Sequence, residues 1–437
     1  MIVLRPLAVL TALALVVLFG ACAKDEERLP GERISVLTFE RALEPDPRLA
    51  GLEVRLPRPQ VNAEWPQSGG YPHHAMHHLA VRDRVDVAWE EDIGEGSDDE
   101  FGLLSAPVIG DRRVFTVDAA GRVTAFDAAS GGRLWHIDLR PESEEDSVFS
   151  GGLGYAKGRL YVTTGHGVVF CLEAASGTVV WRLPIGVPIR AAPTISGGRV
   201  FVRTYDNQLF ALAADRPETL WSHAGIVEPA GLLGSGSPAV ASGIVVVPYS
   251  SGELYALAVE SGRVVWVDTL SYQRPISGLS LLNDIRGSPV IDRDAVYAIA
   301  HNGKLVAIDL RTGTRLWEQN ISGVDTPWAA GDYLYVLSAE GDLLCLARED
   351  GRIRWVTTLP RWMDPEDHDE QLFWSGPILV ADRLLVVGSN GMVLSVSPYS
   401  GALLGRLEVS DPVSLVPVVA DGTIYVLTEE AELIALR

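Results

Sequence analysis

Residues 121–127 read Gly121-Arg-Val-Thr-Ala-Phe-Asp127, and the turn Ser130-Gly131 that follows leads to a tryptophan, Trp135. The pattern starts again at Gly167, Asn207, Gly252, Gly303, Gly341, Gly391 and Ala431. In six of these eight copies a tryptophan stands four residues after the turn residue: Trp135, Trp181, Trp221, Trp266, Trp317 and Trp355. Repeats of about 40–50 residues made of short strands are typical of propeller blades. The sequence therefore predicts an all-β protein, an eight-bladed β-propeller.

Each repeat predicts four strands. A small residue followed by proline opens the first strand, as at Ala106-Pro107, where a missing N–H costs no ladder hydrogen bond. A β-branched and aromatic strand such as residues 113–117 follows, then the Gly-initiated strand and the Trp-bearing strand. The last repeat, residues 413–437, provides only three strands. The segment from Arg84 to Trp89 has the Trp-type strand without a repeat before it, so we expect it to close the ring, giving a propeller of residues 85–437.

The repeated tryptophans have a structural interpretation. A large ring at the same place in successive blades fits between neighbouring blades and buries on the order of 200 Å². We expect this blade-docking role for Trp89, Trp135, Trp181, Trp221, Trp266, Trp317 and Trp355. The seventh blade has Gly405 at this position, so it is expected to pack more loosely against its neighbour.

The charge balance limits the possible partners. The chain has 36 basic and 57 acidic residues among 437, a formal net charge of −21. Such a chain repels a polyanion, which argues against nucleic acid as a partner. Acidic runs at residues 90–100, 142–146 and 364–370 fall between predicted strands, as solvated loops or as calcium ligands.

The N-terminus has the features of a targeting segment. Residues 1–21 contain Arg5 and an apolar run from Leu7 to Phe19, as in a signal peptide that is too short to span a membrane stably. The junction at Cys22 resembles a bacterial lipobox, which implies lipidation of Cys22; ordinary cleavage is the alternative. Residues 22–84 are rich in proline and lack periodicity, so they predict a tether followed by a stretch that rests on the propeller.

Histidines and cysteines are the remaining candidates for chemistry. His73, His74, His77 and His78 would bind a metal if their segment were helical, and otherwise pack on the surface. Cys171 and Cys345 occupy the position that most repeats fill with alanine. We therefore expect two small buried residues on opposite sides of the ring and no disulfide between them.

The repeat itself resembles that of the pyrroloquinoline quinone (PQQ) dehydrogenases. That family implies an eight-bladed propeller with adjacent cysteines, a calcium ion and a catalytic aspartate. Adjacent cysteines do not occur in this sequence, and nor do the motifs of common hydrolases or a phosphate-binding loop. The resemblance therefore implies the fold and not the catalysis.

A second resemblance is more specific. The lipobox, the short tether and the stretch from Ile276 to Pro289, continuing through residues 300–313 to Trp317, resemble the BamB family of outer-membrane assembly lipoproteins. This implies a scaffold without catalytic centre, metal or cofactor, lipid-anchored in the outer membrane and facing the periplasm. It implies docking on the POTRA domains of the barrel-forming subunit, with nascent outer-membrane proteins as further partners.

The family's docking loops correspond to two segments of this chain. The resemblance implies partner contacts at Leu232, Leu233, Asp284 and Arg286, although Leu233 and Arg286 replace an arginine and an acidic residue of the family. The loops between Trp221 and Pro238 and between Trp266 and Pro289 are long and belong to consecutive blades, so they are expected side by side. Loops that merely vary in length are the alternative. Other open functions are a small PQQ-dependent dehydrogenase and a sensor or carbohydrate-binding propeller.

Overall fold

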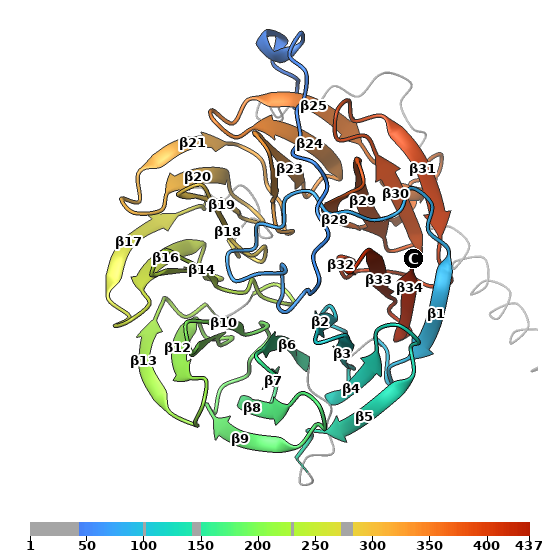
Figure 1. Ribbon diagram of the computed structural model, residues 1–437. Helices are drawn as coiled ribbons and strands as arrows, with labels where there is room; N and C mark the ends of the chain where they lie inside the picture. Colours follow the sequence, from blue (N-terminus) through green and yellow to red (C-terminus); the bar gives the residue numbers. More distant parts are fainter. Residues whose placement is uncertain (1–42, 99–101, 142–149, 229–230, 272–282) are drawn as a thin grey trace, which may run out of the picture. The chain divides into compact units, whose positions relative to one another are not determined.

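The computed structural model describes residues 43–98, 102–141, 150–228, 231–271 and 283–437. Residues 44–437 form one compact unit, in which eight four-stranded antiparallel sheets surround a central axis (Figure 1). The predicted eight-bladed propeller is therefore confirmed. The described residues also include a short hairpin of β26 (Trp362–Asp364) and β27 (Asp369–Gln371) and one turn of 3-10 helix, η1 (Pro47–Leu49).

Each blade is a meander whose strands run in order from the centre of the ring to its edge. Blades 1 and 2 comprise β2 (Val108–Gly110), β3 (Arg113–Val117), β4 (Arg122–Asp127), β5 (Arg133–Asp138), and β6 (Ser150–Ala156), β7 (Arg159–Thr164), β8 (Val168–Glu173), β9 (Val179–Pro184). Blades 3 and 4 comprise β10 (Thr194–Ser196), β11 (Arg199–Arg203), β12 (Gln208–Ala213), β13 (Thr219–Ala224), and β14 (Ala239–Ala241), β15 (Ile244–Pro248), β16 (Glu253–Ala258), β17 (Val264–Thr269). Blades 5 and 6 comprise β18 (Val290–Asp292), β19 (Ala295–Ile299), β20 (Leu305–Asp309), β21 (Arg315–Gln319), and β22 (Trp328–Ala330), β23 (Tyr333–Leu337), β24 (Asp342–Ala347), β25 (Ile353–Thr358). Blades 7 and 8 comprise β28 (Trp374–Val380), β29 (Arg383–Gly388), β30 (Met392–Val396), β31 (Leu403–Glu408), and β32 (Val418–Ala420), β33 (Thr423–Leu427), β34 (Glu432–Leu436), β1 (Val87–Asp92).

Blade 1 shows why the repeat folds in this way. Its middle strands β3 and β4 are almost wholly buried, whereas the outer strand β5 alternates between exposed and half-buried positions. The turn into β5 is held by Asp127, whose carboxylate accepts the backbone N–H groups of Ala129 and Ser130 at 3.1 and 2.9 Å. Gly131 follows with a φ of +78°, a conformation that favours glycine.

Tryptophans occupy seven of the eight junctions between blades. Each indole N–H donates to a backbone carbonyl of the next blade, at distances from 2.7 Å for Trp266 to 3.3 Å for Trp181. At the Trp135 junction the turn of the receiving blade needs glycine, because a Cβ at Gly177 would lie 2.6 Å from the ring of Trp135. The acceptors for Trp89, Trp135, Trp181, Trp221, Trp266, Trp317 and Trp355 are, in order, Ala128, Ala174, Ala214, Val259, Leu310, Arg348 and Pro398.

The N-terminal strand closes the ring, as predicted. β1 pairs antiparallel with β34 and places Trp89 opposite Ala435, so blade 8 contains both ends of the propeller sequence. The strand begins at Val87, three residues later than the predicted start at Arg84. Between blades 7 and 8, where looser packing was expected, Gly405 carries no side chain and a Cβ there would meet nothing within 4 Å.

The central segment, residues 57–80, crosses the middle of the ring (Figure 1). It hydrogen-bonds to the innermost strand of every blade or to the turn that follows that strand. The bonding residues in ring order from blade 1 are Trp65, Pro66, Gln67, Pro72, His73, His77, Leu79 and Asn62. This stretch was expected to rest on the propeller; it instead braces all eight blades from within the compact unit, which begins at Glu44.

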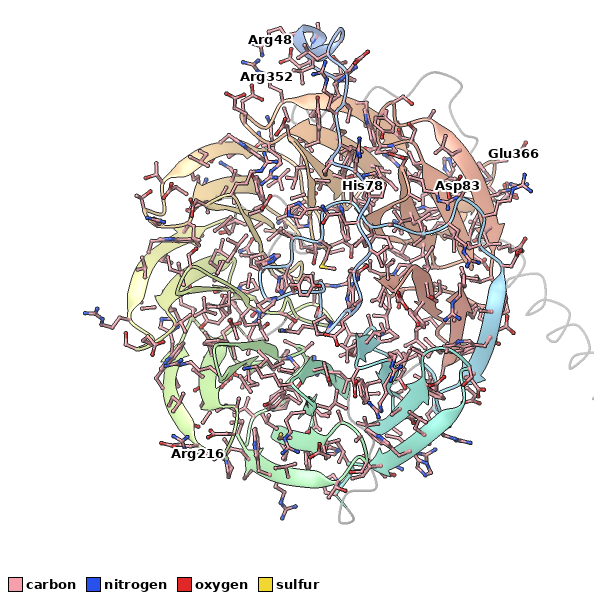
Figure 2. The ribbon with its side chains drawn as sticks, viewed as in Figure 1. Arg48, His78, Asp83, Arg216, Arg352 and Glu366 are labelled. Carbon is pink, nitrogen blue, oxygen red and sulfur yellow. The ribbon has the colours of Figure 1, made fainter. Side chains whose placement is uncertain are left out.

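The side chain of Gln67 shows how tightly the central segment is bound. Gln67 is buried, its Nε2 donates to the carbonyl of Ile195 at 3.0 Å, and its Oε1 accepts the N–H of Ile195 at 2.8 Å. The side chain therefore acts like one more strand residue beside β10. Before residue 57 the chain runs along blade 6 to its outer end, where Asp46 donates its N–H to Ile353 and Arg48 lies near Arg352 (Figure 2).

Cys171 and Cys345 are both buried and unbonded, as expected. They lie in β8 and β24, in blades 2 and 6, and each faces a tryptophan across the sheet, Trp181 and Trp355. Within the described part of the chain, no helix has the length and apolar character required to cross a bilayer.

Candidate functional site

The four clustered histidines do not form a helix. His74 and His77 have φ values of +61° and +54°, and the segment is irregular. His74 is buried and its Nδ1–H donates to the carbonyl of Pro289 at 2.7 Å; burial lowers the pKa of His74 to about 4, so the ring is neutral at pH 7.

His78 also binds protein groups on both sides of its ring. Its Nδ1–H donates to the carbonyl of Pro57 at 2.7 Å, and its Nε2 accepts the N–H of Asp382 at 3.0 Å (Figure 2). Among the described residues no group of three histidine, cysteine, aspartate or glutamate side chains is arranged to hold a metal. The histidines that were candidate ligands therefore help to fix the central segment.

The two long loops lie on the other face of the ring from the central segment. In a four-stranded meander the loops between blades and the turns between first and second strands lie at opposite ends of the strands. The central segment bonds to residues of the latter turns, such as Ala381 and Asp421. The loops that follow β13 and β17 connect consecutive blades, so they emerge at the opposite mouth of the channel.

Asp284 joins these two loops. It lies in the loop between β17 and β18, and residues 272–282 of that loop are not among the described residues. Its Oδ2 accepts the N–H of Leu232, from the loop after β13, at 2.9 Å. The side chain is 2% exposed, so it differs from the expected acidic contact at the surface. Its carboxylate is used inside the molecule, because it satisfies a backbone donor of the neighbouring loop.

Arg203 in β11 provides positive charge beneath Asp284. The guanidinium is fully buried, lies 5.9 Å from the centre of the Tyr249 ring, and its Nη2 donates to Asn207 Oδ1 at 3.1 Å. Burial raises the pKa of Asp284, and the charges of Arg203 and Arg286 oppose that rise. Burial also lowers the pKa of Arg203, and the charge of Asp284 opposes that fall. Each of the two charges therefore favours the ionised form of the other.

Asn207 extends this polar cluster to blade 4. Its Nδ2 donates to the carbonyl of Ile226 at 2.6 Å and to Ser250 Oγ at 2.8 Å, and its Oδ1 accepts the N–H of Ser250 at 3.0 Å. Asn207 has a φ of +61°, which asparagine tolerates better than most residues. Asn207 therefore links the start of the first loop to the turn after β11 in blade 3 and the turn after β15 in blade 4.

The loop that this buried cluster holds carries exposed and half-buried apolar side chains. Leu233 is 46% exposed, Leu232 is half-buried, and Ile226 and Val227 on the same loop are 56% and 65% exposed. We call these four residues the loop patch. Arg286 is half-buried. It lies beside the loop patch, because a Cβ at Gly234, the residue after Leu233, would be 3.9 Å from the Nε of Arg286.

Sequence reasoning located the loop patch only in part. Leu232 and Leu233 were expected, whereas Ile226 and Val227 were missed although both are apolar residues in a predicted loop. Arg203 and Asn207 were missed because they lie in β11 and in the turn after it, and only the structure places them below a loop of another blade. Ala230 and residues 276–282, which belong to the same two long loops, lie outside the described residues.

Comparisons with known proteins agree with this architecture. The sequence model described as "Outer membrane protein assembly factor BamB" matches residues 87–146 and 119–357, more than half of the chain. The outer membrane protein assembly factor BamB of Yersinia pestis is 28% identical over 342 residues, which cover 70% of this chain and 87% of that protein. That of Escherichia coli strain K12 is 26% identical over 349 residues, covering 79% and 86%.

Solved structures support the fold. The crystal structure of BamB from Moraxella catarrhalis superposes with a TM-score of 0.70 at 19% identity, covering 81% of this chain and 99% of that one. Quinohemoprotein alcohol dehydrogenase from Comamonas testosteroni superposes with a TM-score of 0.64 at 13% identity, covering 86% and 80%. At these identities both likenesses concern the propeller and not its chemistry.

Proposed function

The chain belongs to the family of the outer membrane protein assembly factor BamB, and from that premise we propose that it is a non-catalytic scaffold of the machinery that assembles outer-membrane β-barrels. The loop patch docks on the POTRA domains of the barrel-forming subunit. Leu232, Leu233, Ile226 and Val227 supply the apolar contact, and Arg286 supplies charge at its rim. Asp284 acts as a positioning residue, since it holds the first loop against the second.

The observation that carries this proposal is the bond between Leu232 N–H and Asp284, together with the exposed side chains above it. A loop that is fixed from below loses little conformational entropy when a partner binds. Exposed apolar side chains in the middle of such a surface, with charge at the rim, are typical of protein–protein contacts. Loops that varied without function would not need a buried ionic cluster beneath them.

The test measures binding of the full-length chain to purified POTRA domains by calorimetry. The double variant Leu232→Asp/Leu233→Asp is expected to weaken binding by about tenfold or more, since central apolar contacts dominate such interfaces. The matched control is Val179→Asp/Val180→Asp on the outer strand β9, where both side chains are similarly exposed. Equal affinities of the loop variant and the wild type, or equal losses in both variants, would overturn the docking site.

The same proposal places the chain at the periplasmic side of the outer membrane, anchored by a lipid on Cys22. It is supported by the sequence around Cys22, where an apolar run is followed by small residues and the cysteine, as in a lipobox. Mass spectrometry of the mature N-terminus should find a diacylated or triacylated Cys22, and an unmodified N-terminus at another residue would contradict the anchor.

Nascent outer-membrane proteins are the proposed clients. Their strands would pair with the outer strands of the blades, which carry unpaired edges and exposed apolar side chains such as Val264, Val265 and Val267 of β17. Crosslinking from a photoreactive residue at position 265 to an unfolded outer-membrane protein, with position 216 of the inter-strand turn as control, tests this step. Equal yields at both positions would contradict it.

A further inference from the structure

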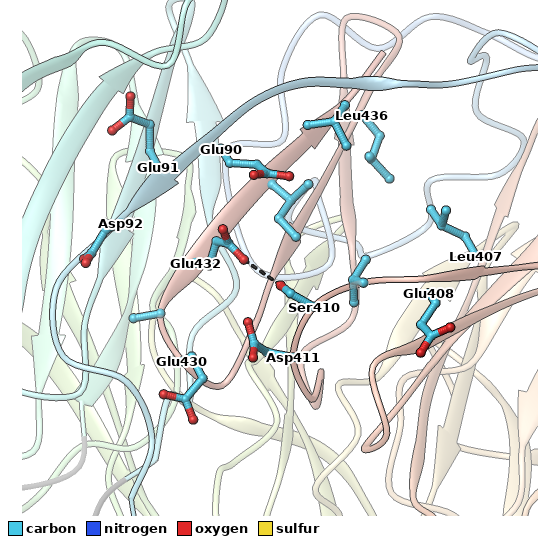
Figure 3. A pocket seen from close by; sticks show the side chains of 14 residues that line it. Glu90, Glu91, Asp92, Leu407, Glu408, Ser410, Asp411, Glu430, Glu432 and Leu436 are labelled. Atoms are coloured by element: carbon cyan, nitrogen blue, oxygen red, sulfur yellow. Dashed lines mark hydrogen bonds between the residues drawn. The ribbon is translucent and has the colours of Figure 1, made fainter.

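A groove of about 670 Å³ lies between blades 7 and 8 (Figure 3). One wall is the end of β31 and the residues after it, from Leu407 to Asp411, and the other consists of β1 and β34. We call it the junction groove. It lies at the outer part of the ring, where the first and last strands of the propeller meet.

The junction groove exists because the repeat is broken on both sides of it. At the other seven junctions a tryptophan stands at the position of Gly405, which lies in β31 two residues before the lining residue Leu407 and on the same face of the strand. The receiving blade is also different, since β34 and β1 come from opposite ends of the chain and no glycine turn connects them. Ser395, opposite Gly405 in the sheet, is half-buried, whereas alanines at its position in other blades are fully buried.

The lining combines apolar and acidic side chains. Leu407, Ile434, Leu436 and Val87 provide apolar surface. Seven carboxylates line the same space, on Glu90, Glu91, Asp92, Glu408, Asp411, Glu430 and Glu432, and no lysine, arginine or histidine is among the lining residues. Of the ion pairs between described residues, none includes one of these seven.

Charge and shape together define the ligand. Like charges that are confined to one groove repel each other and are stabilised by a cation-bearing ligand. The apolar walls at the level of the missing indole fit a large apolar or aromatic side chain. The two strands that frame the groove, β31 and β1, are edge strands of their sheets, so their backbone groups are available to an extended chain.

We propose that the junction groove binds an extended basic segment of a partner protein, which inserts an aromatic or large apolar side chain where blade 7 lacks its tryptophan. Lysine or arginine residues on either side of that side chain pair with Glu90 and Glu432. This site lies in another part of the ring from the loop patch and does not depend on docking to POTRA domains.

The binding test uses three labelled nine-residue peptides and the full-length chain, measured by fluorescence anisotropy. The first peptide has the core Lys-Trp-Lys-Leu-Lys, the second replaces its lysines by glutamates, and the third replaces Trp and Leu by serines. We expect the first to bind and the other two to bind at least about tenfold more weakly, because each lacks one half of the complementarity. Equal binding of the first and third peptides would overturn the proposal in favour of unspecific charge attraction.

Variants locate the site. Gly405→Trp restores the indole that blade 7 lacks, two residues from the lining residue Leu407 and at a position where a Cβ meets nothing within 4 Å. Glu90→Gln/Glu432→Gln removes two charges from the wall of the groove. Both variants are expected to bind the first peptide about tenfold more weakly than the wild type does. The control, Asp364→Asn/Glu366→Gln, removes two charges from the exposed hairpin β26–β27 and is expected to leave binding unchanged.

Three results would contradict the assignment. The first is an equal loss in the control, and the second is unchanged binding in both groove variants; should Gly405→Trp fail to fold, the glutamine pair alone decides. The third is that Ca²⁺ at about 1 mM displaces the peptide and that the same variants abolish Ca²⁺ binding, which would assign the carboxylates to a cation. Leu232→Asp/Leu233→Asp should retain peptide binding, so failure here and failure of the docking proposal are distinguishable.

Discussion

The carboxyl group of Asp325 provides a sharp test of the polar cluster under the loops. Asp325 lies between β21 and β22, where the chain passes from blade 5 to blade 6, and it is buried. Burial raises the pKa of Asp325 to about 6, while the charge of Arg286 and the N–H of Gly376 lower it. The side chain is therefore ionised at pH 7 at a cost in folding free energy.

The magnitude follows from proton linkage. In the unfolded chain the pKa of Asp325 has its ordinary value of 3.8, so between about pH 4 and pH 6 the folded protein binds more protons than the unfolded one. The stability contributed by the protonated carboxyl is complete below pH 3.8 and is lost as the pH rises through the folded pKa of about 6. A difference of about two pKa units corresponds to about 3 kcal/mol, lost in full above that pH.

Asp325→Asn removes this loss, because an amide oxygen still accepts the Gly376 N–H and carries no charge. We expect its free energy of unfolding to exceed that of the wild type by up to about 3 kcal/mol at pH 7.5 and to match it near pH 4. Urea unfolding followed by tryptophan fluorescence at both pH values measures the difference, with the exposed Asp367→Asn as control. Arg286→Met should move the pH window upward, because it removes a charge that favours the ionised carboxylate.

The reasoning about Asp325 would be refuted if Asp325→Asn and the wild type differed by less than about 0.5 kcal/mol at pH 7.5, a change typical of surface substitutions. It would also be refuted if the gain were the same at pH 4, since the effect would then have another origin than ionisation.

Two further predictions concern the brace and the repeat positions. Gln67→Ala leaves the buried N–H and carbonyl of Ile195 unpaired, so it should lower the free energy of unfolding, measured in urea, by about 2–4 kcal/mol. The control Gln371→Ala, in the exposed strand β27, should change it little. If Gln67→Ala cost less than the control, the central segment would not brace blade 3. Burial raises the pKa of Cys171 to about 11 and also raises the pKa of Cys345. At pH 8, which is about 0.5 below the pKa of an ordinary thiol, neither thiol should react with a disulfide reagent until urea unfolds the protein. Reaction of either thiol in the native state would contradict their burial.

The repeat made the ring predictable because its signals are local. Seven of the eight junctions have a tryptophan like Trp135, and at six of them a glycine in a turn of the next blade lies against its ring. The same register predicted that Trp89 closes the ring and that Cys171 replaces an alanine. Gly405 marked the open junction for the same reason, since one missing side chain in a periodic series is visible in the sequence.

The brace and the buried charge could not be read in the same way. The central segment makes one to three hydrogen bonds to each blade, so its residues follow the order of the ring and not a helical or strand period. Asp284 was expected at the surface because the family resemblance implies a partner contact there, and only its bond to Leu232 and the nearby charge of Arg203 show that its carboxylate is used internally. Contacts between residues far apart in sequence leave no periodic signal.

The N-terminal residues therefore have two mechanical roles in one continuous stretch. Residues 57–80 bond to all eight inner strands, and β1, a few residues later, supplies the outer strand of blade 8. A movement that separated blades 7 and 8 would have to break the contacts of Leu79 with β28 or of Asn62 with β32, whereas one that opened blade 8 itself would have to break the β1–β34 ladder. The central segment thus holds blades 7 and 8 together from the middle of the ring, and the junction groove can remain unfilled by an indole without opening the propeller. A rigid ring keeps the loop patch and the junction groove at a constant separation, which is what a scaffold that engages two segments at once requires.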